Sequence, residues 1–389
     1  MIKITITNDI DEPSLGRKWN NLLDLAANPL PFQRHEWVKC CLGRRLLRGG
    51  KLFILLAVSD NELVGIAPFI KRDIFFPAHS RISFIGTGYS DYFDFIIKPG
   101  LEEAVIGAFV DEITRRLKNF EIELRNIFSS SLSTKAIAKD MVSAKLCVRR
   151  YLQDGVPYLE LLSSREDFYA GVKAKLRSDI ERQKRRLQKA GELKLIECVE
   201  LNEALAALED FFSLHIKRWE SNKGYSAYKF EYMRNLMRSV LKSLFPEKIA
   251  KMYYLEHNNK KIAVCFAYSM NGRFIYYAPS YDSEYAVYSP GKILVSLLID
   301  KAIESGMREF DFGIGNEAYK LEWSPKNREL YTFHIFSKRN RPEVFIIKML
   351  SAIRAGYAYV ILPRLRKIVF LVRLWRFMRR KTGKYRRFE

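Results

Sequence analysis

The stretch with the clearest potential for chemistry runs from Phe274 to Trp323. Its residues predict a strand containing Tyr276, then a tight turn, a helix and a second short strand. The first N–H groups of a helix have no partner inside it, and the helix dipole favours negative charge there. The turn therefore predicts a site for an anion such as a pyrophosphate, formed by Tyr288, Ser289, Pro290, Gly291 and Lys292.

A single aspartate occupies the short strand that follows this helix. Asp311 lies between Phe310 and Phe312, in a sequence that predicts burial. Burial raises the pKa of a carboxyl group toward the range in which it acts as a general base near neutral pH. The alternative is a structural aspartate that caps the turn at residues 313–315. The sequence leaves both interpretations of Asp311 open.

These motifs resemble a known family. The segments Tyr288–Lys292, Phe310–Gly313 and Glu317–Trp323 are similar to the acetyltransferase domain of the CelD/BcsL type, a branch of the GNAT superfamily related to FemAB aminoacyltransferases. The GNAT phosphate loop usually reads Gln/Arg-x-x-Gly-x-Gly/Ala, whereas this turn supplies only Gly291. The resemblance implies an acyltransferase that uses acetyl-CoA or another acyl-CoA, without a metal.

The resemblance also implies roles for residues outside the turn. Tyr319 would protonate the leaving thiolate, and Lys320 would bind the donor phosphate or the acceptor, unless both only anchor the loop. A helix expected from residue 204 to residue 222 flanks the acceptor groove in such domains. This helix would place His215, Arg218 and Trp219 beside the substrate, and Tyr276 of the strand before the turn is a further substrate candidate. The alternative for His215 is a packed histidine, which is common beside a tryptophan.

The order of predicted elements indicates an α/β protein of the α+β, mixed-sheet kind, with tandem GNAT-like lobes. Residues 1–150 form a degenerate first lobe that lacks a phosphate loop, and residues 151–337 form the acyltransferase lobe. Residues 338–389 form a basic amphipathic helical tail. With 389 residues, 48% of them hydrophobic, the chain is long enough to bury the core of two lobes.

A glycine-rich loop interrupts the first lobe at residues 86–92 and reads Gly-Thr-Gly-Tyr-Ser-Asp-Tyr. Glycine in a loop between strands supplies positive φ angles, which is a purely structural use. The other interpretation is that Tyr89, Asp91 or Tyr92 faces the substrate. The sequence leaves both possibilities open.

The charge of the chain predicts an anionic partner. The formal net charge is +22, and eight Lys and Arg lie between Lys173 and Lys189 on a predicted long helix from residue 164 to residue 191. This basic face would contact tRNA or lipid phosphate, or remain solvated. The five cysteines show no metal-binding spacing, and no apolar run reaches the length of a transmembrane helix. We therefore expect a cytoplasmic protein, peripheral at the inner face of the membrane.

Two enzymatic hypotheses and one non-enzymatic hypothesis follow. The first is an acyl-CoA-dependent N- or O-acyltransferase acting on a sugar or lipid-linked intermediate in envelope polysaccharide biosynthesis. The second is a FemAB-like aminoacyltransferase whose donor is aminoacyl-tRNA, suggested by the incomplete phosphate loop. The third is a non-catalytic scaffold associated with the membrane. The acceptor, the acyl chain and the oligomeric state do not follow from the sequence.

The tail generates a prediction of its own. Residues 338–389 carry sixteen Lys and Arg but only two Glu, a net charge of +14, interleaved with Leu374, Trp375 and Phe377. Each basic residue near an anionic surface contributes on the order of 1 kcal/mol to membrane binding. We expect the full chain to sediment with anionic liposomes in a salt-sensitive manner, and a chain truncated after Ser337 to stay folded in the supernatant. A full chain that ignores anionic liposomes at low salt would contradict this prediction.

Overall fold

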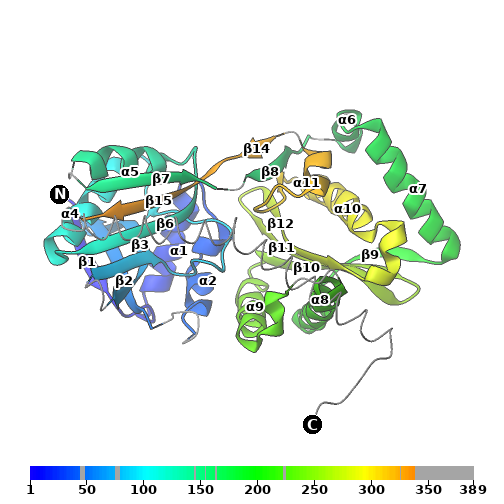
Figure 1. Cartoon of the computed structure of the whole chain (residues 1–389), viewed down its shortest axis with the longest axis horizontal. Coiled ribbons are helices and arrows are strands. Elements are labelled where there is room, and N and C mark those ends of the chain that lie inside the picture. The colour runs from blue at the N-terminus through cyan, green and yellow to red at the C-terminus, as the bar shows by residue number, and fades with distance from the viewer. Residues whose placement is uncertain are drawn as a thin grey trace, which may run out of the picture.

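The computed structural model describes residues 1–43, 49–74, 79–143, 146–153, 155–162, 164–221, 225–324 and 326–337. The predicted tail, residues 338–389, lies outside the described residues. Within the described ranges the chain forms two lobes, each built on a mixed sheet with helices packed against it (Figure 1). The predicted α/β fold class with tandem GNAT-like lobes is confirmed.

The first lobe is built on an eight-stranded sheet of order β1-β2-β3-β4-β6-β15-β7, with β5 paired to β3. Every neighbouring pair is antiparallel except β4 and β6, which are parallel and joined through the helix α4 (Glu102–Arg116). Its strands are β1 (Lys3–Thr7), β2 (Lys51–Ser59), β3 (Glu62–Ile74), β4 (His79–Phe84), β5 (Ile96–Ile97), β6 (Phe120–Phe128), β7 (Cys147–Leu152) and β15 (Leu330–Phe336).

The second lobe repeats this plan in a seven-stranded sheet of order β14-β8-β13-β12-β11-β10-β9. Here β12 and β13 are the parallel pair, and α10 (Pro290–Glu304) joins them. Its strands are β8 (Val156–Glu160), β9 (Leu193–Glu197), β10 (Ala250–His257), β11 (Lys260–Met270), β12 (Arg273–Tyr281), β13 (Glu309–Asp311) and β14 (Asn327–Arg328). The turn at Asn258-Asn259 joins β10 to β11, and the turn at Asn271-Gly272 joins β11 to β12. All four residues have positive φ.

Helices cover both sheets and fill the space between the lobes (Figure 1). In the first lobe these are α1 (Leu15–Leu25), a 3-10 turn η1 (Pro31–Gln33), α2 (His35–Cys40), α4 and α5 (Leu132–Ser143). In the second lobe they are α6 (Arg165–Ala170), α7 (Ala174–Ala190), α8 (Leu201–Ser221), η2 (Ala227–Lys229), α9 (Glu231–Leu244), η3 (Ser283–Tyr288), α10 and α11 (Ala318–Trp323). The apolar core that includes α1, α2, α8 and α9 is continuous from one lobe to the other.

The structure corrects two predicted boundaries. The predicted long helix from residue 164 to residue 191 is two helices, α6 and α7. Ser164 caps the start of α6, and this helix ends at Gly171, before α7 begins. The predicted second lobe, residues 151–337, extends too far, because the strands of the second sheet all lie between Val156 and Arg328. Its last strand, β15, lies in the first sheet between β6 and β7, because there both of its edges find antiparallel partners.

The two lobes are joined by buried aromatic and polar contacts. Phe32 packs edge-on against Tyr268 with ring centroids 5.3 Å apart, and the Trp37 indole donates to the Tyr268 hydroxyl at 3.2 Å. The Tyr92 hydroxyl of the first lobe donates to Asp311 Oδ1 of the second at 2.6 Å. Both Tyr92 and Asp311 are fully buried, so this bond replaces the water that each group loses on folding.

Removal of the Tyr92 hydroxyl tests this joint. A hydrogen bond to a buried carboxyl group contributes on the order of 1–3 kcal/mol, because the group left behind is desolvated without a partner. We expect urea denaturation of Tyr92→Phe to show a loss of that size. Tyr331→Phe, which removes an exposed hydroxyl bonded to Glu329, should change the free energy of unfolding by less than about 0.5 kcal/mol. Equal stability of the two variants would show that the bond does not hold the lobes together.

Candidate active site

Two adjacent cavities lie above β12 in the second lobe. The central cavity has a volume of about 550 Å³, and the side cavity, of about 220 Å³, lies at the start of α10. Arg218, Tyr276, Pro279 and Tyr319 line both, so the two cavities are neighbours along one wall. The other residues of the central cavity are Asp91, His215, Trp219, Tyr228, Tyr277, Ala278, Phe312, Gly313, Ile314, Glu317 and Lys320.

The side cavity holds the predicted anion site. Ser289, Gly291 and Lys292 line it, with Ser289 in the left-handed conformation (φ 51°) that turns the chain into α10. Pro290 has no N–H, and the N–H groups of Lys292 and Ile293 donate to the Ser289 carbonyl. No described group accepts from the Gly291 N–H, which leaves it available to a ligand. The predicted turn residue Tyr288 is not among the residues that line this cavity.

The equivalent helix of the first lobe, α4, does not offer an anion site at its start. The helix α4 begins at Glu102, and its first turn carries Glu102 and Glu103. The Glu102 carboxylate accepts the Gly100 N–H at 3.0 Å, so the helix start is occupied by an acidic side chain of its own. An anion would meet repulsion there, which agrees with the prediction that the first lobe is degenerate.

The carboxylate that faces the central cavity comes from the first lobe. Asp91 belongs to the loop at residues 86–92 and reaches across to the second lobe, where the Ile314 N–H bonds to it. Burial and, second, like-charge repulsion from Asp311 together raise the pKa of Asp91 to about 7, against the opposing effects of the Ile314 N–H and Lys320. A carboxyl group with this pKa exchanges a proton near neutral pH.

The loop that carries Asp91 is fixed from several sides. Tyr277 donates its hydroxyl to the Tyr89 carbonyl at 3.1 Å, and Asn126 donates its side-chain amide to the Asp91 carbonyl at 2.9 Å. Gly86 has a φ of +86°, and a Cβ at this position would lie 2.8 Å from the Trp37 ring. The conformational role of the loop glycine is therefore present, while Asp91 faces the cavity and its contact with a substrate stays a prediction.

Asp311 lies behind the wall of the central cavity. Its side chain is 0% exposed, Oδ1 accepts from the Tyr92 hydroxyl and the Gly313 N–H, and it lines neither cavity. Burial raises its pKa, and the guanidinium of Arg273 is the strongest influence in the opposite direction. Asp311 therefore positions the Tyr92 hydroxyl and the backbone at Gly313. Its predicted role as general base stays a prediction, and it has no direct contact with the cavity to support it.

Tyr319 and Lys320 occupy different situations although they are neighbours on α11. Tyr319 lines both cavities, and burial raises its pKa, so that its hydroxyl keeps its proton at neutral pH. Lys320 lines the central cavity, but its ammonium donates to the Ile314 carbonyl at 2.7 Å and pairs with Glu317 at 2.8 Å. Lys320 thereby anchors the loop that presents Ile314 to Asp91.

The predicted substrate residues on α8 line the central cavity. Trp219 donates its indole N–H to His215 Nε2 at 3.1 Å, so the remaining proton of the ring lies on Nδ1, 2.9 Å from Ser226 Oγ. Burial and the charge of Arg218 lower the pKa of His215 to about 4. His215 is therefore neutral, and it positions Trp219 instead of exchanging protons with a substrate.

Arg218 is the cation between the two cavities. Its guanidinium lies over the Tyr281 ring, 4.4 Å from the centroid, and within the described ranges it forms no ion pair with an acidic side chain. A guanidinium held on an aromatic face without a carboxylate partner remains free to bind an anionic or polar ligand. Tyr276 completes the wall on the strand side and is fully buried, with its ring against Phe310.

In the part of the chain that the structure describes, no group of three or more His, Cys, Asp or Glu side chains is arranged to hold a metal ion. None of the described helices is long and apolar enough to cross a membrane.

Residues 174–321 match the family described as acetyltransferase (GNAT) domain. This segment contains α10, Asp311, Tyr319, Lys320 and the predicted substrate helix, but not Asp91. No curated protein matches the chain.

Several solved structures share the two-lobed fold. The crystal structure of FemX is 10% identical with a TM-score of 0.62, covering 89% of this chain and 99% of FemX. The C-terminal domain (DUF2156) of a putative lysylphosphatidylglycerol synthetase from Agrobacterium fabrum is 11% identical with a TM-score of 0.53, covering 87% and 95%. L-PGS from Bacillus licheniformis is 13% identical with a TM-score of 0.53, covering 88% and 96%.

The second lobe therefore contains a GNAT acyltransferase domain, and the protein is an acyltransferase. The expected GNAT domain and the enzyme class are confirmed. At these identities the structural similarities describe the fold alone.

The raised pKa of Asp91 predicts how stability changes with pH. Its pKa is about 7 in the folded protein and 3.8 in the absence of structure, so the folded state binds more protons between these values and stability falls as pH rises through that window. Asn cannot ionise, so Asp91→Asn removes this loss. We expect the melting temperature of Asp91→Asn to exceed that of the wild type at pH 8, and the difference to vanish near pH 4. A variant less stable at pH 8 would show that the ionised carboxylate is stabilised by its surroundings.

Proposed function

We propose that the protein transfers an acyl group from acyl-CoA directly to an amine or hydroxyl group held in the central cavity. The observation that carries this proposal is the position of Asp91, a carboxyl group with a pKa of about 7, in the cavity next to the start of α10. The acceptor would be a sugar or lipid-linked intermediate in envelope polysaccharide assembly, as the resemblance to CelD/BcsL-type domains implies.

The reaction requires two proton transfers and no covalent enzyme intermediate. The acceptor nitrogen or oxygen attacks the thioester carbonyl carbon, and Asp91 takes the proton that the acceptor loses. The carbon–sulfur bond then breaks, and the protonated hydroxyl of Tyr319 supplies a proton to the thiolate. Arg218 lies between the cavities and would orient polar groups of either substrate.

The donor would enter through the side cavity. The Gly291 N–H would bind a phosphoryl oxygen at the start of α10, where the helix dipole favours the anion. The thioester would then extend past Tyr276 and Tyr319, which line both cavities, toward Asp91. Trp219, Tyr228 and Tyr276 give the central cavity broad apolar faces against which an acceptor ring could pack.

Loss of Asp91 provides the direct test. We expect Asp91→Asn to lower kcat at least about 100-fold in an assay of thiol release from acyl-CoA with a panel of amine and hydroxyl acceptors. The kcat/KM of the wild type should rise with pH to a plateau, with a midpoint near pH 7. Asp300→Asn is the control, because Asp300 is also buried with a raised pKa but lines neither cavity. Equal losses in both variants would remove Asp91 from the mechanism.

Gly291 allows the donor site to be tested separately. The surroundings of Gly291 leave room for a methyl group, since a Cβ there would lie 3.5 Å from the Tyr281 ring, at ordinary contact distance. Gly291→Ala should therefore fold normally while it narrows the side cavity. We expect a higher KM for acyl-CoA and an unchanged KM for the acceptor. An unchanged KM for acyl-CoA would place the donor elsewhere.

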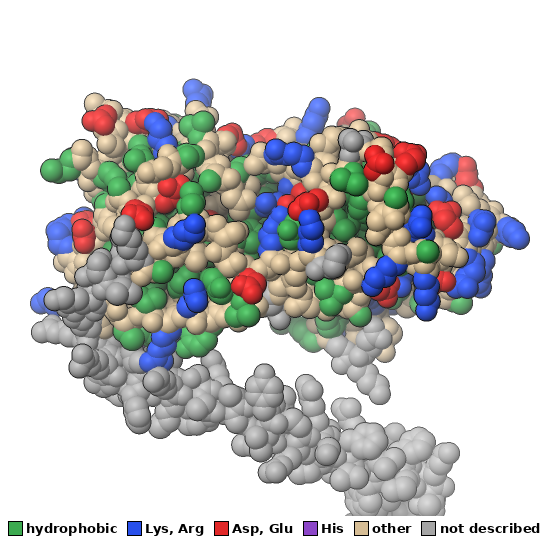
Figure 2. Space-filling view, turned by 90° about the horizontal axis from the view of Figure 1, so that it is seen from above, with side chains coloured by type: hydrophobic (Ala, Val, Ile, Leu, Met, Phe, Trp, Pro, Cys, Tyr) green, Lys and Arg blue, Asp and Glu red, His purple; other side chains and the backbone are tan. Residues whose placement is uncertain are grey.

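A specific observation favours a second candidate, transfer from aminoacyl-tRNA. The start of α10 offers one free N–H to a pyrophosphate, whereas the basic helix α7 lies beside it, with Arg186 over the Tyr288 ring at 4.9 Å. Figure 2 shows Lys and Arg side chains gathered at the end of the molecule that α7 occupies, with acidic side chains among them. A cavity of about 100 Å³ between α7 and α10 is lined by Arg182, Gln183 and Lys292, among others.

Binding of tRNA separates the two candidates. Neutralising Lys184, Arg185 and Arg186 together should abolish salt-sensitive tRNA binding if the donor is aminoacyl-tRNA. Neutralising Arg115, Arg116 and Lys118 of the first lobe serves as a matched control. Absence of tRNA binding by the wild type would favour acyl-CoA. The membrane attachment proposed for residues 338–389 is independent of either donor.

A further inference from the structure

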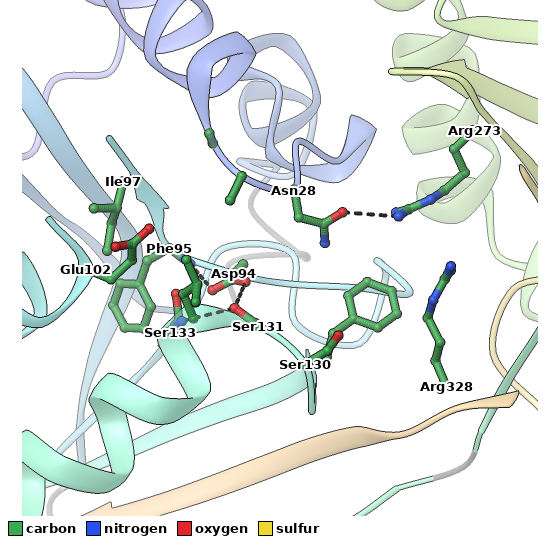
Figure 3. A pocket seen from close by; sticks show the side chains of 14 residues that line it. Asn28, Asp94, Phe95, Ile97, Glu102, Ser130, Ser131, Ser133, Arg273 and Arg328 are labelled. Carbon is green, nitrogen blue, oxygen red and sulfur yellow. Dashed lines mark hydrogen bonds between the residues drawn. The ribbon is translucent and has the colours of Figure 1, made fainter. Parts of the chain in front are cut away.

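A further cavity lies between the lobes and shares no lining residue with the central cavity (Figure 3). We call it the arginine cavity, after Arg273 and Arg328 of the second lobe, and its volume is about 330 Å³. We propose that it binds a small molecule with a phosphate or carboxylate group on a hydroxyl-bearing body. This inference does not depend on the proposed transfer reaction.

The second lobe contributes two positive charges to this cavity. Arg273 pairs with Glu309 at 2.7 Å, and Arg328 pairs with the same carboxylate at 2.6 Å. The other carboxyl group nearby is that of Asp311, 3.9 Å from Arg328, and burial raises its pKa. The two guanidinium groups thus share one close carboxylate, that of Glu309, while Asp311 lies at the longer distance, which leaves positive charge at this end of the cavity.

Aromatic rings and partial burial hold these guanidinium groups in place. Arg328 lies 3.6 Å from the Tyr158 ring centroid, and both arginines lie about 6 Å from the Phe128 ring, at 5.9 and 6.0 Å. Their side chains are only 19% and 21% exposed. A planar guanidinium fixed in this way loses little entropy when it binds an oxyanion.

The first lobe contributes polar groups at the opposite end, among them the carboxyl groups of Asp94 and Glu102, so an anionic group would bind at the arginine end and away from the start of α4. Figure 3 shows Asp94 and Ser131 facing Arg273 and Arg328 across the cavity, with Asn28 between them. Asp94 is 7% exposed, and Ser131 donates its hydroxyl to Asp94 Oδ2 at 2.5 Å. The side-chain oxygen Oδ1 of Asn28 accepts a hydrogen bond from Arg273 Nη2 at 3.1 Å. An oxygen of a bound anion would lie beside this atom and also accept from Arg273.

The shape and charge of the cavity define the class of ligand. Its volume exceeds that of an inorganic phosphate and is at the lower end of small-molecule sites, so the anionic group would carry a body of a few carbon atoms. Hydroxyl groups on that body would meet Asp94, Ser130 and Ser131, which offer acceptors and donors. A bound molecule would contact both lobes, so it would stabilise the folded chain by binding that state alone.

Phosphate binding by the full chain tests the proposal. In a chloride buffer, inorganic phosphate and glycerol 3-phosphate should each raise the melting temperature to a saturating value, and calorimetry should show one site. We expect glycerol 3-phosphate to bind at least about threefold more tightly, because its hydroxyl adds hydrogen bonds on the Asp94 side. No saturable binding by either probe would overturn the proposal, and equal affinities would remove the hydroxyl-bearing body from it.

The Asn28→Asp variant places the anion in the protein itself. Its carboxylate would pair with Arg273, so it should weaken binding of both probes at least about tenfold without lowering the melting temperature. Arg308→Gln lowers the net charge equally at an exposed position and should keep the wild-type affinity within about twofold. Unchanged binding in Asn28→Asp would contradict the assignment.

The central cavity is the competing location for the probes. Arg218→Gln removes its free cation, and we expect this variant to bind both probes as the wild type does. Binding lost in Arg218→Gln but kept in Asn28→Asp would place the anion in the central cavity and refute a site between Arg273 and Arg328. The result would leave the proposed transfer reaction untouched.

Discussion

The hydrogen bond from Tyr92 to Asp311 fixes the arrangement on which the site depends. Both groups are fully buried, and a buried polar group that loses its partner is costly. The two lobes therefore keep one relative position at this point. Asp91 immediately precedes Tyr92 in the chain, so the same constraint holds its carboxylate against Ile314 and Gly313 of the other lobe. A Cβ on Gly313, whose φ is +74°, would lie 3.0 Å from Asp91 Oδ2, which shows how closely the lobes approach.

Three carboxyl groups of this region, those of the buried Asp311 and Asp94 and of the half-buried Asp91, have different surroundings, and these suggest different uses. Asp311 is bonded to Tyr92 and lies near arginines, so it serves the joint between the lobes. Asp94 is satisfied by Ser131, and burial raises its pKa to about 6. Asp91 faces a cavity, and its pKa is about 7. Asp91 and Asp94 both combine a raised pKa with a cavity, but of the two only Asp91 faces the cavity next to the start of α10.

The two lobes share one plan, yet the ends of their equivalent helices have diverged. In each sheet a helix joins a parallel pair of strands within otherwise antiparallel neighbours, α4 in the first lobe and α10 in the second. Glu102 fills the start of α4 with negative charge, whereas the start of α10 keeps the free Gly291 N–H. The start of α4 thus carries an acidic side chain, while the first lobe contributes Asp91 to the lining of the central cavity. The central cavity is therefore lined by residues of both lobes.

The sequence by itself determined the features that rest on local chemistry. The hairpins of β2 with β3 and of β10 to β12, the turn into α10 at Ser289 and the GNAT motif near Tyr319 all follow from residues close together in the chain. Only the tertiary structure decided that β15 joins the first sheet and that Asp91, not Asp311, faces the cavity. These outcomes depend on contacts between residues some 200 positions apart, such as that of Tyr92 with Asp311. The periodicity and spacing of residues in the sequence do not indicate such contacts, because both are local patterns. Burial and charge also decided the protonation of Asp91, and both arise only when the two lobes close around it.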